Sequence, residues 1–278
     1  MKCNVNDGGL CSVIMSVYIK DSVENVEKAI ESILNQTYNN INLLISIDGE
    51  VKSSVNELLS QYKDNPKCHI YKNDTNMGLA YRLNELIECC LLQSDCEYIA
   101  RMDADDISIG HRIEKQILFL SNNENVQVLG SSIFEIDELD NIHGEKIMES
   151  DDFNLKSNII KRCPFNHPTV IFRKEILESG FRYNEELLNT QDYHLWIDMA
   201  KANVVFSNVQ EPLLMFRIDN EFYSRRGRKK AINDFKGKIK AINVLRRHSP
   251  KNYFYAVSIL LLRLSPASIT KLAYKYLR

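Results

Sequence analysis

Three aspartates, Asp103, Asp105 and Asp106, follow a short apolar run at residues 97–102. The run indicates a buried strand that emerges at its carboxyl end into a polar crevice, where open α/β sheets place their ligands. Carboxylates this close repel one another by about 4 kcal/mol per pair at 4 Å and an effective dielectric near 20, so a cation usually separates them. Hard oxygen ligands favour Mg²⁺ or Mn²⁺, which bridge to phosphates. One interpretation is therefore metal–phosphate chemistry, and the other is an acidic loop in which Asp106 caps the following helix.

The segments that must position these aspartates alternate between strand and helix patterns. A β-branched run predicts a strand at 11–18, and Asp21 and Glu24 have the spacing of a capping box before a helix that continues to Leu34. Further strands are expected at 41–48, 68–72, 97–102 and 126–137, with helices at 51–62, 79–90 and 111–120 between them. This order predicts a mostly parallel sheet with helices on both faces. The carboxyl ends of its strands would bring Asp48 and Asp103 to one rim.

The second half of the chain has a less regular pattern. Helices are expected at 153–160 and 190–202, and strands at 167–173, 204–209 and 213–218. From residue 226 onward the chain is expected to be helical, with breaks near Ser249-Pro250 and Ser265-Pro266. Residues 225–278 hold fifteen Lys or Arg and a single acid, Asp234, for a net charge of +14, so the chain's total of −2 leaves −16 for the rest. We therefore expect an acidic body with a basic tail.

The composition is that of a globular protein, with 44% hydrophobic and 26% charged residues. At 278 residues the chain can bury one large core, or one large domain with a small appendage. The seven cysteines form no Cys-x-x-Cys pair, which favours a reduced, cytoplasmic protein. The amino terminus has no apolar core for a signal peptide. The longest apolar run, 254–262, is far shorter than the roughly 20 residues of a membrane-spanning helix.

Several segments together resemble the inverting, nucleotide-sugar-dependent glycosyltransferases of family 2, which have the GT-A fold. More narrowly, the chain resembles bacterial members that build O-antigen or capsule chains. It covers nearly the whole chain and rests on the following segments in the family's order and spacing: 12–18, 29–38, 76–79, 99–107, 112–116, 167–173 and 191–196.

The resemblance implies a GT-A catalytic domain over 1–220, with a nucleotide-sugar half at about 10–137 and an acceptor half at about 138–220. A basic helical segment would follow at 221–278. It further implies a UDP-linked donor and a Mn²⁺ or Mg²⁺ cofactor. The implied donor-site residues are Tyr18, Asp48, Arg82, Asp103 and Ala104, with Asp105 as the direct metal ligand.

Within that site, Asp48 is similar to the aspartate that reads the uracil ring, although Asp48-Gly49-Glu50 departs from the family's frequent Asp-Gly-Ser. Arg82 matches an arginine that faces the nucleotide, and a solvated helix residue is the alternative. Asp103 would meet the ribose or a metal-bound water, and Asp106 would cap a helix.

Inversion also requires a base that takes the proton of the attacking hydroxyl. Asp192 matches the family's base position, although Gln191 replaces the acid that often precedes it. Trp196 is expected to form either a platform for the acceptor sugar or part of the core. A direct role for His167 is an alternative to a structural one, and Arg217, together with Arg225, lies where relatives place a segment over the diphosphate.

The basic tail suggests a peripheral site on the cytoplasmic face of the inner membrane, with an acceptor glycan on a lipid carrier. Tyr253, Phe254, Tyr255 and the leucines at 260–262 would dip into the interface. The alternative is a helical subdomain that packs on the catalytic body with a solvated basic face. Because no nucleic-acid readout module is recognisable, a nucleic-acid partner is not expected.

Two other functions compete with glycosyl transfer. A nucleotidyltransferase or phosphotransferase would use the aspartates as a metal clamp, but residues 103–107 lack a phosphoaspartate pattern. A non-catalytic scaffold in a polysaccharide assembly complex is the second alternative, and the presence of both Asp105 and Asp192 argues against it.

Overall fold

The computed structural model describes residues 8–218 and 228–265 of the chain. Its first half contains β1 (Leu10–Val17), α1 (Val23–Leu34), β2 (Ile41–Asp48), α2 (Ser53–Gln61), β3 (Cys68–Asn73), α3 (Leu79–Leu91), β4 (Cys96–Asp103), β5 (Ile107–Ser108), α4 (Arg112–Asn122) and β6 (Val128–Ile136). The second half contains β7 (Ile142–Lys146), α5 (Asp152–Asn158), β8 (Ile171–Arg173), α6 (Lys174–Glu178), α7 (Gln191–Lys201), β9 (Phe206–Arg217), α9 (Arg228–Val244) and α10 (Pro250–Leu264).

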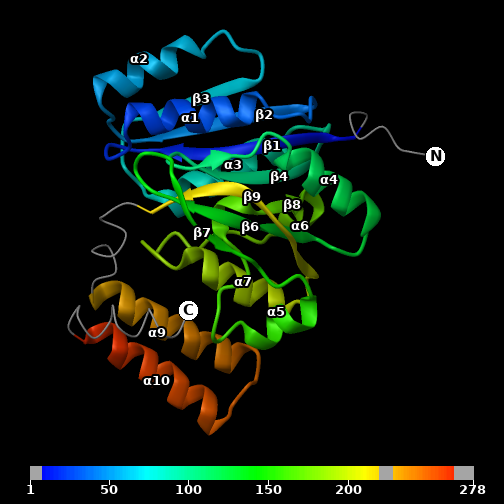
Figure 1. The fold of residues 1–278 in the computed structure, drawn as a ribbon, viewed down its shortest axis with the longest axis vertical. Helices are drawn as coiled ribbons and strands as arrows, with labels where there is room; N and C mark the ends of the chain where they lie inside the picture. The colour runs from blue at the N-terminus through cyan, green and yellow to red at the C-terminus, as the bar shows by residue number, and fades with distance from the viewer. Residues whose placement is uncertain (1–7, 219–227, 266–278) are drawn as a thin grey trace.

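One nine-stranded sheet forms the centre of the molecule (Figure 1). Its strand order is β3-β2-β1-β4-β8-β6-β9-β5, and β7 pairs with β6. β1 is parallel to β2 and β4, and β2 is parallel to β3. The carboxyl ends of these four strands therefore meet at one rim, which confirms the expected α/β architecture.

The second half departs from a regular parallel order at β8. This short strand is antiparallel to both β4 and β6 and lies between them. Residues His167–Thr169 form a 3₁₀ turn instead of the first part of the expected strand. The two strands expected at 204–209 and 213–218 are one strand, β9, whose register shifts beside Pro212. A proline donates no ladder hydrogen bond, so the strand bulges there and continues.

The start of α1 also differs from the expectation. Ser22 is the N-cap, and its Oγ accepts a hydrogen bond from the Asn25 N–H. The predicted capping box with Asp21 and Glu24 is therefore wrong. The side chain of Asp21 turns back instead and accepts a hydrogen bond from the Tyr18 N–H at 2.9 Å.

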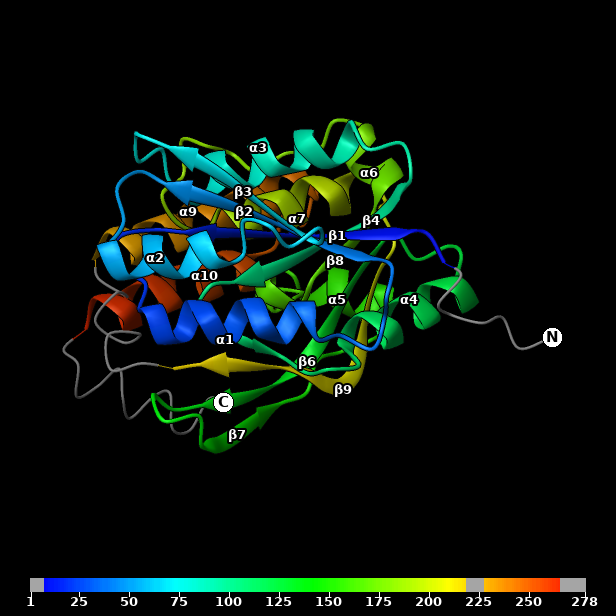
Figure 2. The ribbon, with the colours of Figure 1, turned by 90° about the horizontal axis from the view of Figure 1, so that it is seen from above.

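Helices cover both faces of the sheet, and Figure 2 shows α1 and α3 on opposite sides of it. Alternate residues of β1 explain the two cores. Val13 and Met15 pack in a cluster with residues of α1, α2 and α4, whereas Ile14 packs in a cluster with residues of α3, α6, α7 and α9. A strand that is buried on both faces reads as a continuous apolar run, as β1 does.

The C-terminal helices α9 and α10 continue the second core. Ala241 and Ile242 of α9 and Ala256 of α10 are buried in it. Gly237 lets α9 approach α7 closely, because a Cβ there would come within 2.9 Å of the Tyr193 ring. Figure 1 shows α10 at the end of the molecule opposite α2. Across the described residues, every helix is too short or too polar to cross a membrane.

Candidate active site

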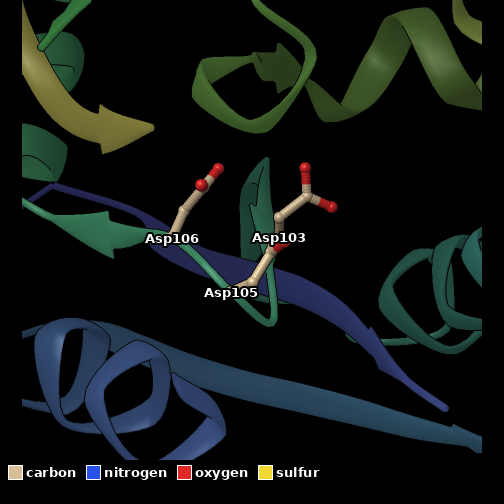
Figure 3. Close-up of side chains that lie close together, drawn as sticks. All are labelled: Asp103, Asp105 and Asp106. Atoms are coloured by element: carbon tan, nitrogen blue, oxygen red, sulfur yellow. The ribbon is translucent and has the colours of Figure 1, made fainter. Parts of the chain in front are cut away.

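The three aspartates lie where β4 ends and the chain turns toward β5 (Figure 3). One carboxylate oxygen from each lies within 4.8 Å of the others. Asp103 and Asp105 are half-buried, Ala104 is buried, and Asp106 is only 1% exposed. The sequence therefore predicted a real cluster, and the separate donor and metal roles given to its members stay predictions.

The donor set of this cluster suits a hard divalent cation. It offers carboxylate oxygens only, and Asp106 Oδ2 is buried with no hydrogen-bond partner among the described residues. Burial raises the pKa of Asp106 well above its ordinary value, and the charges of Asp105 and Asp103 raise it further. A cation among these oxygens would relieve both the repulsion and the unmet hydrogen-bonding capacity. The residues therefore fit Mg²⁺ or Mn²⁺.

Asp106 does not cap the helix that follows, so that expectation is wrong. α4 begins at Arg112 after His111, and β5 intervenes and pairs with β9. Asp106 Oδ1 instead accepts a hydrogen bond from the Arg217 N–H at 2.9 Å. This contact holds the aspartate turn against the end of β9.

Arg217 braces the same turn through its guanidinium group. Its Nε donates to the Asp105 carbonyl at 2.9 Å, and Nη1 donates to the Asp137 carbonyl at 2.8 Å. Its Nη2 forms an ion pair with Asp140 at 2.6 Å. All three guanidinium nitrogens of Arg217 therefore contact the protein and stabilise the aspartate turn. A contact between Arg217 and a diphosphate stays a prediction. Arg225 lies outside the described residues.

A fourth carboxyl group, Asp21, lies near the cluster at the end of β1. Burial raises its pKa to about 7, and the charges of Asp105 and Asp103 contribute to this rise. Its hydrogen bond from the Tyr18 N–H closes the turn that carries Tyr18. The sequence predicted only a helix-capping role for Asp21, and no sequence pattern indicated that it lies near the cluster.

Arg101 is a buried cation beneath the cluster, and sequence analysis missed it. Its side chain is 1% exposed and pairs with the Asp103 carboxylate. The fully buried Arg112 donates to the Arg101 carbonyl at 2.8 Å and thereby fixes this part of β4. The sequence contained a signal for this ion pair, because residues two apart on a strand face the same side of the sheet, as Arg101 and Asp103 do.

Asp48 and Arg82 form a second buried group at the rim. Asp48 accepts hydrogen bonds from the Met77 and Gly78 N–H groups, at 2.8 and 3.0 Å, and from Arg82 Nε at 2.9 Å. Arg82 also pairs with Glu85. Arg82 is therefore a buried ion-pair member, and the alternative of a solvated helix residue is wrong. Both residues fix the turn before α3, and their contact with a nucleotide stays a prediction.

Asp192 is the second residue of α7 and is half-buried. Burial raises its pKa, while a hydrogen bond from the Tyr193 N–H and the charges of Arg101 and Lys230 act in the opposite direction. A carboxylate with a raised pKa is a better proton acceptor than an ordinary aspartate. Burial thus favours proton acceptance by Asp192, and its role as the base stays a prediction.

Trp196 is 0% exposed and lies in the core. Its ring packs on Phe165 and Phe172, with centroids 4.9 and 5.8 Å apart. The core alternative describes this position, because the indole has no exposed face for a sugar. His167 Nε2 lies 2.8 Å from Tyr183 Oη, and burial together with Arg101 lowers the pKa of His167. His167 is therefore neutral at physiological pH.

Arg101 interacts electrostatically with both the aspartate cluster and the groups near α7. Its charge acts on Asp103 and Asp106 at the rim, and also on Asp192 and His167. One buried cation thus lies within electrostatic range of both the metal-type cluster and the half-buried carboxylate of α7. The arrangement suits a reaction in which a phosphate group and an ionised carboxylate act at neighbouring positions.

Comparison with known sequences gives the family of this chain. Residues 12–181 match the sequence profile of Glycosyl transferase family 2. The chain belongs to this family. The matched region includes β1 to β4, the aspartate turn and His167, whereas Asp192 lies beyond it.

Several relatives of this family 2 protein take part in polysaccharide synthesis. The E. coli UDP-Gal:alpha-D-GlcNAc-diphosphoundecaprenol beta-1,3-galactosyltransferase is 32% identical over 233 residues, which cover 81% of this chain and 80% of that protein. The E. coli O-antigen biosynthesis glycosyltransferase WbnJ is 33% identical, with 76% of this chain and 81% of that protein covered. The Erwinia amylovora amylovoran biosynthesis glycosyltransferase AmsE is 30% identical, with 77% and 79% covered.

Solved structures agree on the fold. S. aureus TarS in complex with UDP-GlcNAc superposes with a TM-score of 0.62 at 14% identity, covering 94% of this chain and 82% of that one. The mannosyltransferase PcManGT of Pyrobaculum calidifontis, in complex with GDP-Man and Mn²⁺, superposes with a TM-score of 0.57 at 14% identity, covering 98% and 80%. The family 2 chain therefore has the GT-A type of α/β fold.

Proposed function

We propose that this family 2 protein transfers a sugar from a UDP-sugar to a glycan hydroxyl with inversion, in the synthesis of a surface polysaccharide. The observation that carries the proposal is the pairing of two carboxylate sites around Arg101. The rim cluster suits a metal-bound diphosphate, and Asp192 is a half-buried carboxylate with a raised pKa. The relatives that make O-antigen and amylovoran support the polysaccharide setting.

The donor would lie along the rim formed by β1, β2 and β4. Tyr18 and the buried pair of Asp48 and Arg82 would bound the nucleotide, and Asp103 with the Ala104 backbone would meet the ribose. Asp105 would hold Mn²⁺ or Mg²⁺, which supplies charge neutralisation for the leaving diphosphate when bound. Arg217 keeps the Asp105 carbonyl and Asp106 in place for this purpose.

Inversion follows from a single displacement. The acceptor hydroxyl oxygen attacks the anomeric carbon from the face opposite the diphosphate, and the bond from that carbon to the diphosphate oxygen breaks. The hydroxyl proton passes to the Asp192 carboxylate, and UDP leaves. Burial supports the base role because it raises the pKa of Asp192 above its ordinary value.

The relatives and the charge of the chain support a proposal for the acceptor and for the location of the enzyme. One relative acts on a sugar linked to diphosphoundecaprenol, which supports an acceptor on a lipid carrier here. We also propose a cytoplasmic enzyme that binds the inner membrane peripherally through the basic segment at 221–278.

The test is a transfer assay with a panel of UDP-sugars in Mn²⁺, Mg²⁺ or EDTA. Asp105→Ala should lose metal-dependent UDP binding, and Asp192→Asn should bind UDP normally but transfer sugar about 10²- to 10⁴-fold more slowly. Asp198→Asn is the matched control, because Asp198 lies on the same helix and is also half-buried, but pairs with Lys240 of α9. Transfer by Asp192→Asn at the parent rate would reject the base assignment, and metal-independent transfer would reject the cofactor.

A further inference from the structure

The outer face of α10 carries apolar side chains that the rest of the described protein leaves exposed. Phe254, Val257, Leu261 and Leu264 follow one another at intervals of three, four and three residues, so they share one side of the helix. Phe254 is 75% exposed, and the other three are also exposed. The stripe is about 15 Å long at 1.5 Å per residue. A contiguous apolar patch of this kind marks an interaction site.

The opposite side of α10 holds the helix on the body of the protein. Ala256 is buried, and Tyr255 Oη donates a hydrogen bond to the Lys161 carbonyl at 3.2 Å. Arg263 forms an ion pair with Asp234 of α9. These contacts hold α10 on α9, which lies between α10 and α7 in Figure 1, and they leave the apolar stripe exposed.

The two C-terminal helices and the turn between them expose several basic side chains. Lys229 and Lys236 on α9, Arg246 in the connecting turn and Lys251 at the start of α10 are all exposed. The only acid of residues 225–278, Asp234, is already paired. Lys251 lies three residues before Phe254 and therefore on the same side of α10. An apolar stripe with an exposed cation at its start, on a strongly basic segment, complements a surface with an acyl interior and anionic head groups.

We propose that α10 lies flat on an anionic lipid bilayer and inserts Phe254, Val257, Leu261 and Leu264 at the interface. This inference deepens the proposed function, on which it rests for its purpose, by naming the helix face that meets the membrane. At fifteen residues α10 is too short to span a bilayer. A symmetric pairing of two copies through the same stripe would bring two segments of +14 together, and their repulsion disfavours it.

The experiment is co-sedimentation of the full chain with vesicles of phosphatidylcholine alone or mixed with phosphatidylglycerol. The chain should sediment with the anionic vesicles only, and high salt should weaken the binding. The double variant Phe254→Ser/Leu261→Ser should bind at least about tenfold more weakly, and Lys251→Gln about fivefold more weakly. Phe153→Ser is the matched control, because Phe153 is also 75% exposed but follows Asp151 and Asp152. It should bind like the parent chain.

Several results would overturn the proposal. These are equal binding by the double variant and its parent, equal binding to both kinds of vesicle, or a dimer in sedimentation velocity that the double variant dissociates. If vesicle binding appeared only when the chain was shortened to end at Ser265, residues 266–278 and not a membrane would be the natural occupant of the stripe. UDP-sugar hydrolysis without vesicles is measured in parallel. Absence of hydrolysis by the parent chain would reject the proposed function. Hydrolysis by a parent chain that fails to sediment with anionic vesicles would reject only the membrane face.

Discussion

Replacement of Asp21 by Asn should stabilise the metal-free protein at neutral and alkaline pH. Asp21 lies near Asp103 and Asp105, and burial and these two charges raise its pKa from 3.8 to about 7. Its ionised form is therefore less stable in the folded protein than in the unfolded chain. Asn removes the charge and keeps an oxygen that accepts the Tyr18 N–H.

The size and sign of the effect follow from the pKa of Asp21. The difference between 3.8 and about 7 corresponds to at most about 4 kcal/mol. Because Asp21 is half-buried, solvent screening reduces the expected gain in unfolding free energy to about 2 kcal/mol. A carboxyl whose folded pKa is raised destabilises the protein fully above that pKa and not at all below its unfolded value. The gain should thus be complete above pH 7 and should disappear as the pH falls toward about 4.

Denaturant unfolding in EDTA at pH 8, 6 and 4.5 measures the effect. Asp64→Asn is the control, because Asp64 is an exposed aspartate in the turn after α2. Millimolar Mn²⁺ should shrink the gain from Asp21→Asn, since a cation among the aspartates offsets the same repulsion. An equal gain at pH 4.5 and pH 8 would refute the electrostatic reasoning, and so would destabilisation at pH 8.

Three further predictions concern buried groups of the site. Arg101→Met should raise the pKa of Asp192, because the charge of Arg101 lowers it, and should move the acid side of the pH–rate profile for sugar transfer to higher pH. Arg101→Lys should leave the pH–rate profile unchanged. An unshifted profile in Arg101→Met would contradict this reasoning. Asp48→Asn should lower the unfolding free energy by about 3 kcal/mol, because it leaves the buried Arg82 guanidinium with a weaker partner. Urea denaturation measures this change, and an unchanged midpoint would contradict the prediction. Trp196→Ala should lower the unfolding free energy by about 3–5 kcal/mol in urea denaturation, because Trp196 is fully buried. Trp196→Phe should fold and keep the parent KM for the acceptor, and a raised KM would restore the sugar-platform interpretation.

Periodicity in the sequence predicted the parallel half of the sheet well. β1 and β2 are largely apolar runs buried on both faces, and β4 is buried except at Glu97 and Asp103. The bounds of all three agree with the expected strands within a residue or two. The aspartate cluster was predictable for the same reason, since Asp103 ends β4 and the next acids follow at once. Local pattern is sufficient where neighbouring residues determine the structure.

Features that depend on distant segments were not predictable. Asp106 has the spacing of a helix cap, but a backbone N–H from β9, more than a hundred residues later, holds its side chain. Ser22 and not Asp21 caps α1, because the Asp21 carboxyl is drawn to the Tyr18 N–H. Trp196 lies on a helix whose sequence leaves its buried side ambiguous, and only its packing on Phe165 and Phe172 places it in the core.

The close fit of α9 on α7 has a consequence for exchanges of sequence between relatives. α7 carries Asp192, and Gly237 of α9 meets the Tyr193 ring one residue further on. Lys240 of α9 also forms an ion pair with Asp198 of α7 at 2.7 Å, so the contact extends beyond one residue. A chimera that took its C-terminal helices from another family member would therefore need the matching α7 surface as well. The proposed membrane face and the proposed base are therefore expected to be inherited together.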